Sequence, residues 1–123
     1  MTMADYLPKY TIGAAVTFTA STTIIGGRLV AVAGHHLVAP AASDSASVVG
    51  VAAFDVVVGD PVTVYMRPSG VQRLTASGPI AAGAKVAADA SGKVQTIAGL
   101  LNPIGVALET ATTNLDVIDV LFI

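Results

Sequence analysis

The chain has no cysteine, and charged residues make up only 11% of its 123 residues. The absence of cysteine excludes disulfide bonds, thiolate nucleophiles and cysteine-ligated metals. Ordinary soluble domains carry about 25% charged residues, so much of this surface must be uncharged. Because few ions lose their water when such a surface is covered, the composition favours packing against copies of the chain or a larger assembly. The alternative interpretation is a thermally robust monomer with a plain surface.

The basic residues are too few and too scattered for a nucleic-acid site. Six Lys and Arg residues stand against eight Asp and Glu residues, which gives a net charge of −2. Nucleic-acid binding needs a stripe or patch of basic residues that neutralises phosphates. We therefore expect no nucleic-acid partner. The six residues occur singly, at Lys9, Arg28, Arg67, Arg73, Lys85 and Lys93.

Hydrophobic residues make up 54% of the chain, which raises the question of a membrane segment. The clearest uncharged stretch, residues 11–27, contains six Ser or Thr, three Gly and no Leu. Such a stretch makes a poor spanning helix. The first residues, MTMAD, lack the basic and apolar regions of a signal peptide. We expect neither a signal peptide nor a membrane partner.

The length fits a single domain, and the local pattern predicts an all-β fold. Twelve Gly, six Pro and many β-branched residues interrupt nearly every window long enough for three helical turns. About ten short strands, spaced by roughly ten residues and separated by turn residues, indicate a small β-barrel or sandwich. The expected strands are 15–19, 28–32, 36–38, 48–53, 61–66, 71–75, 85–88, 94–97, 104–108 and 116–122.

An internal similarity suggests that the barrel consists of two similar halves. VGVA at 49–52 resembles IGVA at 104–107, and VTVYM at 62–66 resembles VIDVL at 117–121. Both pairs are offset by 55 residues, which favours an internal two-fold repeat. The Gly-bounded segments 27–34 and 83–92 do not keep that offset, and chance similarity in an Ala/Val/Gly-rich chain is the alternative.

The first ten residues differ from the rest. They include DYLPKY at 5–10, with two of the three tyrosines, and Pro8 disfavours a regular helix there. We expect an extended N-terminal arm at 1–10, followed by a single β-barrel domain at 11–123.

The sequence gives no catalytic, metal or cofactor site. In a strand, the adjacent His35 and His36 would point to opposite faces, so they could not both bind one metal without distortion. The ordinary explanation is a solvated turn histidine beside a half-buried one. Asp116 and Asp119 are expected on opposite faces of the last strand, which separates the two carboxylates. Glu109 follows a strand and is expected to be solvated. The sequence also lacks a Gly-x-Ser-x-Gly elbow and a Gly-rich phosphate loop. We therefore expect no catalytic residue, no metal, no cofactor and no enzymatic activity.

Eight short motifs follow one another along nearly the whole chain. They are YTIG at 10–13, VTFTA at 16–20, GGRLV at 26–30, VGVA at 49–52, GDPVTV at 59–64, IAAGAKV at 80–86, SGKV at 91–94 and IGVAL at 104–108. Each motif is weak alone, but their succession resembles the capsid cement, or head decoration, proteins of tailed bacteriophages. The resemblance extends from about Tyr6 to Phe122.

This resemblance implies a β-barrel or β-clip-like protein that is made in the host cytoplasm and sits on the outer surface of the virion capsid. Such proteins are commonly homotrimers that reinforce contacts between subunits of the major capsid protein. With the low charge, it suggests that the arm contacts the capsid through Tyr6, Leu7, Pro8 and Tyr10. Alternatively, Tyr6 and Tyr10 cap the open end of the barrel.

Two other functions fit the same sequence. The first is a β-clip-like binding or accessory module for a small ligand or partner protein, because IAAGAKV at 80–86 also resembles the strand-loop units of β-clip domains in sugar-acid enzymes. Those enzymes would need acid-rich or metal-binding loops, which the sequence lacks. The second is a structural module associated with a tail or fibre.

Overall fold

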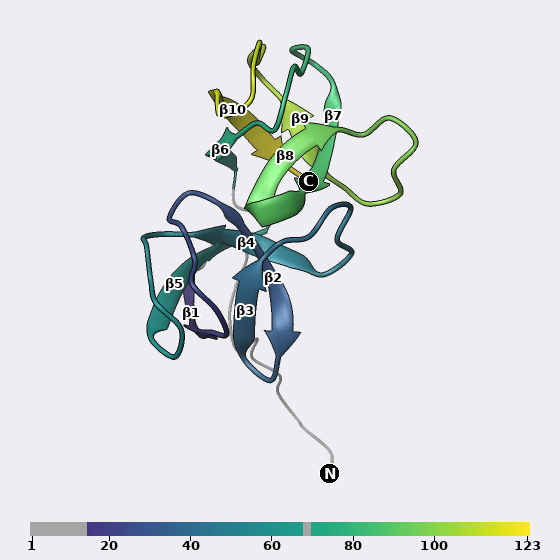
Figure 1. The fold of residues 1–123 in the computed structure, drawn as a ribbon. Coiled ribbons are helices and arrows are strands. Elements are labelled where there is room, and N and C mark those ends of the chain that lie inside the picture. Colours follow the sequence, from purple (N-terminus) through teal and green to yellow (C-terminus); the bar gives the residue numbers. More distant parts are fainter. Residues whose placement is uncertain (1–14, 68–69) are drawn as a thin grey trace, which may run out of the picture.

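A computed structural model describes residues 15–67 and 70–123. This part of the chain is all-β, as predicted, with ten strands and one short 3₁₀ turn. Each of the ten expected strands is present, and its bounds differ from the expected ones by two residues at most. The strands form two units that lie one above the other (Figure 1). We call residues 15–67 the N-terminal unit and residues 70–123 the C-terminal unit.

The N-terminal unit is a closed five-stranded barrel with the strand order β1-β3-β2-β4-β5. All neighbouring strands are antiparallel except β1 and β3, which pair in parallel at Thr19–Leu37 and Ala20–Val38. That short parallel contact closes the barrel. The strands are β1 (Ala15–Ala20), β2 (Leu29–Gly34), β3 (Leu37–Pro40), β4 (Val48–Ala52) and β5 (Pro61–Met66).

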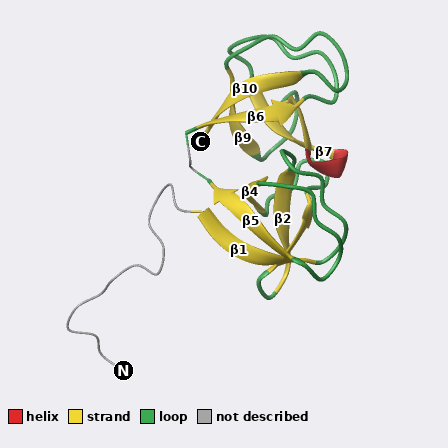
Figure 2. Ribbon diagram, turned by 90° about the vertical axis from the view of Figure 1, so that its left-hand side faces the viewer, coloured by secondary structure: helices red, strands yellow, loops and turns green. Residues whose placement is uncertain are grey.

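The C-terminal unit repeats this arrangement in a five-stranded sheet of order β6-β10-β9-β7-β8. A parallel bridge between Ala76 and Val94 joins the end of β6 to β8, where β1 meets β3 in the other unit. Figure 2 shows the two units from a second direction. The elements are β6 (Val71–Thr75), β7 (Lys85–Asp89), η1 (Ala90–Gly92), β8 (Lys93–Thr96), β9 (Pro103–Ala107) and β10 (Val117–Phe122).

The predicted internal repeat is visible in equivalent contacts of the two units. Ser21 Oγ donates to the carbonyl oxygen of Val38 at 3.2 Å, and Ser77 Oγ donates to that of Val94 at 3.2 Å. Each unit also has an isolated antiparallel bridge between the loop before its second strand and the loop before its last strand. We call these loops the bridge loops: 21–28 and 53–60 in the N-terminal unit, and 76–84 and 108–116 in the C-terminal unit.

The 55-residue offset holds for β4 and β9 but is wrong by one residue for β5 and β10. A Cβ on Gly50 would collide with the carbonyl oxygen of Tyr65, and one on Gly105 with that of Leu121. Tyr65 and Leu121 are therefore equivalent, at an offset of 56. With this offset, the buried Val62 is equivalent to the buried Ile118 and not to the exposed Val117. Because side chains alternate between faces, the one-residue slip would have exchanged buried and exposed positions.

The repeat also includes the Gly-bounded segments, which do not keep the 55-residue offset. Gly27 and Gly83 occupy equivalent turns with φ of 80° and 89°, where a residue with a Cβ would be strained. Their offset is 56, like that of the strands on either side. The second repeat is one residue shorter than the first between β8 and β9, which reduces the offset to 55. One extra residue in its turn at 112–114 restores the offset to 56.

The buried residues form two hydrophobic clusters, and one of them extends across both units and holds them together. One cluster contains most of the buried residues of the C-terminal unit together with Leu29, Ala31 and Val51 of the N-terminal unit. Val30, between Leu29 and Ala31, instead packs inside the N-terminal barrel with Val62 and others. The first half of β2, residues 29–31, is therefore buried on both faces, one in each cluster.

Polar contacts add to this junction. The Asp44 carboxylate accepts hydrogen bonds from the main-chain N–H groups of Leu101 at 3.2 Å and Asn102 at 3.0 Å. Asn102 Nδ2 donates to the carbonyl oxygen of Asp44 at 3.0 Å. Arg67 donates to the main-chain oxygens of Val48 and Ile123. Partial burial lowers the pKa of Arg67, although a guanidinium remains charged in proteins.

Among the described residues, no helix is long and apolar enough to cross a membrane. Residues 15–20 of the uncharged stretch form β1 instead.

Candidate assembly surfaces

The bridge loops of the N-terminal unit form an apolar groove of about 610 Å³. Ile24 and Val56 pair across it through main-chain hydrogen bonds of 2.9 and 3.0 Å. Their side chains are almost fully buried and form its floor. The pairing holds together two segments that are about thirty residues apart in the sequence.

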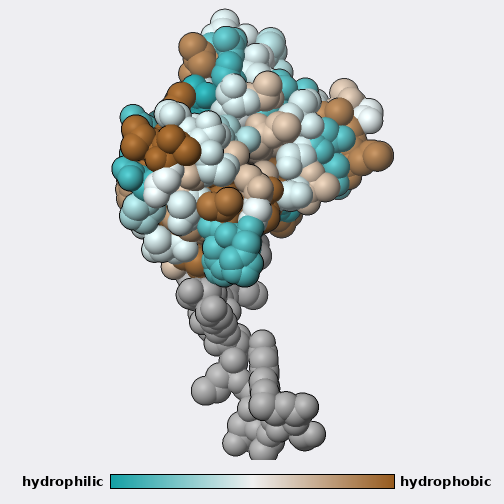
Figure 3. All heavy atoms as spheres, turned by 60° about the horizontal axis from the view of Figure 1, so that its bottom comes forward, coloured by the Kyte–Doolittle hydropathy of each residue, from teal (hydrophilic) through white to brown (hydrophobic). Residues whose placement is uncertain are grey.

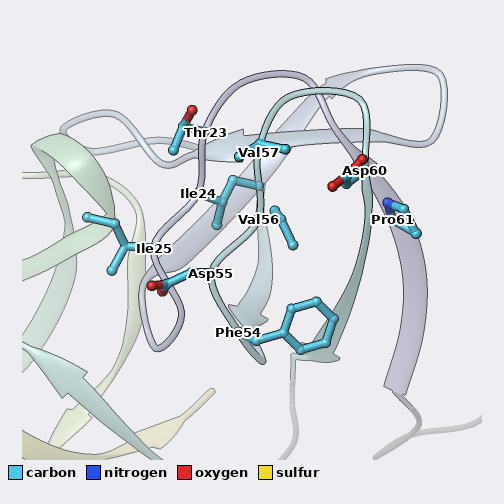
Figure 4. A pocket seen from close by; sticks show the side chains of 9 residues that line it. All are labelled: Thr23, Ile24, Ile25, Phe54, Asp55, Val56, Val57, Asp60 and Pro61. Atoms are coloured by element: carbon cyan, nitrogen blue, oxygen red, sulfur yellow. The ribbon is translucent and has the colours of Figure 1, made fainter.

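The walls of the groove are large apolar side chains that remain about half exposed. They are Ile25 at 50%, Phe54 at 47% and Val57 at 59%. Figure 4 shows Phe54 at one end of the groove, and Thr23 and Val57 at the other. Gly26 makes the close approach of the loops feasible, because a Cβ there would lie 2.7 Å from Cα of Phe54.

Two carboxylates, Asp55 and Asp60, stand at the sides of the groove (Figure 4). Asp55 is held in place because its Oδ1 accepts the Gly26 N–H at 2.7 Å. All nine lining residues belong to the described part of the chain, and none of them is basic. The groove therefore combines an apolar surface with two negative charges.

Other exposed apolar side chains are spread over both units. On the outer face of β6 and β10, Val71 lies opposite Leu121, beside an exposed Arg73–Asp119 ion pair of 3.9 Å. Leu101, in the loop that Asp44 holds, is 84% exposed. Figure 3 shows brown, apolar patches separated by pale, weakly polar areas and by several teal, hydrophilic patches on the face seen there. This is the ion-poor exterior that the composition predicts.

Comparison with protein families bears on the functions left open by the sequence. Residues 10–122 match the family model of phage cement proteins. The chain belongs to this family. The resemblance of its motifs is thereby confirmed, and the chain has a structural role in the phage capsid, within the virion.

The cement protein also resembles a solved phage structure. It superposes on the head fiber gp8.5 N base of bacteriophage phi29 with a TM-score of 0.69, covering 89% of this chain and 93% of that one. The sequence identity is 21%, so the likeness concerns the fold. A search of curated proteins gives no match.

The arm residues predicted to contact the capsid cannot be placed in this structure. Tyr6, Leu7, Pro8 and Tyr10 all lie outside the described residues. Their role stays a prediction.

Both histidines lie exposed in the turn between β2 and β3, so a turn histidine is present as expected, whereas His36 does not belong to the strand expected at 36–38. His36 adopts a φ of 53°, and its ring is 5.4 Å from that of His35 and 5.8 Å from that of Phe18. The turn therefore brings the two rings together rather than to opposite faces. Within the described residues, His, Asp and Glu side chains do not gather into a group of three that could hold a metal.

The carboxylates singled out by the sequence shape the loops of the cement protein. Asp116 precedes β10 rather than belonging to it, and its carboxylate accepts the N–H groups of Thr112 at 2.9 Å and Thr113 at 3.1 Å. These hydrogen bonds lower the pKa of Asp116. Glu109 accepts the N–H of Asp119 at 2.7 Å. Asp116 thus closes the turn before β10, and Glu109 links its bridge loop to that strand.

Sequence reasoning missed the groove because Ile24, Ile25 and FDVVV at 54–58 belong to no expected strand. An available signal was the comparison of the two repeats. FDVVV in the first repeat stands where the second has ETATTN at 109–114. The difference between them marks a surface that the fold does not require.

Proposed function

We propose that the chain is a capsid decoration protein, which binds the outer surface of an assembled phage head as a homotrimer. There it reinforces contacts between subunits of the major capsid protein. The family match over residues 10–122 carries this proposal. The uncharged exterior supports it, because covering such a surface removes few ions from water.

The N-terminal arm contributes to this binding through Tyr6, Leu7, Pro8 and Tyr10. Tyrosine offers a large contact area at a low cost in side-chain entropy. Three arms on one trimer make each later contact intramolecular, which raises the apparent affinity by about 10² to 10⁴-fold over a single arm. In this proposal, the contact surfaces of the arm and the barrel carry out the function, and a catalytic site does not.

The first test mixes the purified protein with undecorated heads of the parent phage. Co-sedimentation and negative-stain images should show added density on the outer surface. Mass measurement in solution should give about 37 kDa, three times the 12.3 kDa of one chain. A protein that stays monomeric and fails to associate with the heads contradicts the proposal.

The second test deletes residues 2–10. We expect folded protein, judged by circular dichroism, with an affinity for heads reduced by at least about tenfold. Unchanged affinity would show that the arm takes no part in binding.

The groove is the observation that favours the second candidate, a binding module for a small ligand. Its volume of about 610 Å³ lies in the usual range for small-molecule sites, about 300–1,000 Å³. A ligand-dependent rise in the melting temperature, together with no binding to heads, would favour this alternative.

A further inference from the structure

The duplicated fold provides an internal control for the groove. The C-terminal unit has the same bridge, between Ile80 and Ala111, with main-chain hydrogen bonds of 2.9 Å in both directions. Around the bridge its loops follow the same path, because Thr110 Oγ1 accepts the N–H of Ala82 as Asp55 Oδ1 accepts that of Gly26. The surface chemistry is nevertheless different. Ile25, Phe54 and Val57 of one unit are replaced by Ala81, Glu109 and Thr113 in the other.

Folding therefore does not explain the apolar walls. An equivalent pair of loops forms the same bridge with small or polar side chains at these positions. Half-exposed phenylalanine, isoleucine and valine side chains leave apolar area in water, which is unfavourable unless a partner covers it. The apolar walls are thus a feature of the N-terminal unit alone, and their presence needs an explanation other than folding.

The dimensions and the charge of the groove define its occupant. A stable interface between two globular subunits takes about 20–30 residues from each side. The groove has nine lining residues, which suits one or two side chains of an extended segment. Asp55 and Asp60 at its sides, with no basic residue among the described lining residues, favour a positive charge next to the inserted apolar group.

We propose that this groove binds an extended segment of the major capsid protein, in which a large apolar side chain lies next to a Lys or Arg. The apolar side chain packs against Phe54 and Val57, and the basic group lies near one of the two carboxylates, Asp55 or Asp60, which stand on opposite sides of the Ile24–Val56 bridge (Figure 4). This inference rests on the proposed capsid-binding function and names the capsid element that is recognised.

The decisive variant is Phe54→Glu, because the C-terminal unit carries Glu109 at the equivalent position and folds with it. We expect this variant to bind undecorated heads at least about tenfold more weakly than the wild type, as for loss of a central anchor residue. The matched control is Leu108→Glu, which adds the same charge at a side chain that is 49% exposed, against 47% for Phe54. The control should bind within about twofold of the wild type.

The outcomes separate this inference from the function on which it rests. If the wild type does not bind heads, the capsid-binding function fails and the groove inference fails with it. If wild type and Phe54→Glu bind equally, only the groove inference is overturned. If Phe54→Glu loses its oligomeric state by mass measurement, the groove is an interface between copies, which also overturns the inference.

A second pair of substitutions tests the charge. Asp55→Asn and Asp60→Asn together remove both negative charges, and the asparagine introduced at position 55 keeps a side-chain oxygen for the Gly26 N–H. We expect binding several-fold weaker at low salt and a smaller loss of affinity on adding salt than in the wild type. Equal salt dependence would contradict a basic group in the segment.

Peptides test the identity of the segment. In an array of overlapping peptides of the major capsid protein, those that bind the wild type but not Phe54→Glu should contain an aromatic or large aliphatic residue next to Lys or Arg. A peptide of residues 1–14 that competes with heads for the wild type would instead place the chain's own N-terminus in the groove. That result would overturn the proposed occupant.

Discussion

At the positions equivalent to Ile25, Phe54 and Val57 of the N-terminal bridge loops, the C-terminal bridge loops carry Ala81, Glu109 and Thr113, although both pairs of loops form the same bridge. What the units share lies at positions where backbones meet: the bridge, the Ser–carbonyl contact and the glycine against the last strand. What differs lies on the outside. The comparison separates residues that maintain the fold from residues available for assembly.

Substitution of the equivalent glycines in β4 and β9 is expected to have the largest effect on stability, and it tests whether the two units are equally constrained. In Gly50→Ala and in Gly105→Ala, the new Cβ would collide with a carbonyl oxygen of the neighbouring strand. We expect each to lose about 3 kcal/mol or more of unfolding free energy, measured by chemical denaturation. Gly78→Ala is the control, because a Cβ there meets nothing within 4 Å. If Gly105→Ala kept its unfolding free energy while Gly50→Ala lost it, the two units would not be equally constrained.

The shared core predicts that the units unfold together. Val64 and Val120 are equivalent and fully buried, but they belong to different clusters. Changing either to Ala should cost about 2–3 kcal/mol and lower the midpoint of a single transition for the whole chain. Hydrogen exchange should show protection lost in both units. Two separate transitions would mean that the units fold independently.

Asp44 tests the polar part of the junction. Asp44→Ala removes the carboxylate that accepts the N–H groups of Leu101 and Asn102, and we expect a loss of about 1–2 kcal/mol. Asp44→Asn should lose less, because it keeps one acceptor and tolerates the φ of 52° at this residue. Equal losses in the two variants would point to the charge rather than to the hydrogen bonds.

The smallest effect concerns pH. Because the folded state lowers the pKa of Asp116, its contribution to stability is complete above the unfolded pKa, near 4. It is lost as the pH falls below about 4 through the folded pKa. Asp116→Asn should therefore flatten the pH dependence of the denaturation midpoint in this acid range. An unchanged slope would show that the turn at Thr112 and Thr113 does not depend on the ionised carboxylate.

Local pattern was sufficient for most of the fold. Strands such as 61–66 and 71–75 alternate or contain β-branched residues between turn residues, and the structure has both with the expected bounds. The alignment of one repeat with the other needed more than local pattern. A single insertion near Thr112 shifted β10 by one residue, and nothing local to either strand reveals which alignment buries Ile118.

The candidate site was less predictable than the fold. Ile25 and Phe54 come from loops, where neither a strand nor a helix period marks the exposed face. His36 is expected in the strand at 36–38, but the turn between β2 and β3 includes it, and no local pattern marks that boundary. The groove exists only because the bridge joins Ile24 to Val56.

The sequence by itself determined an ion-poor exterior, the ten strands and their positions, and the two-fold repetition, because charge content, side-chain alternation and turn residues act locally. Only the tertiary structure decided the register of the repeats, the burial of both faces in the first half of β2, and the groove. These depend on main-chain hydrogen bonds between segments far apart in the chain. Such bonds have nearly the same strength in neighbouring registers, so the packing of the whole molecule selects among them.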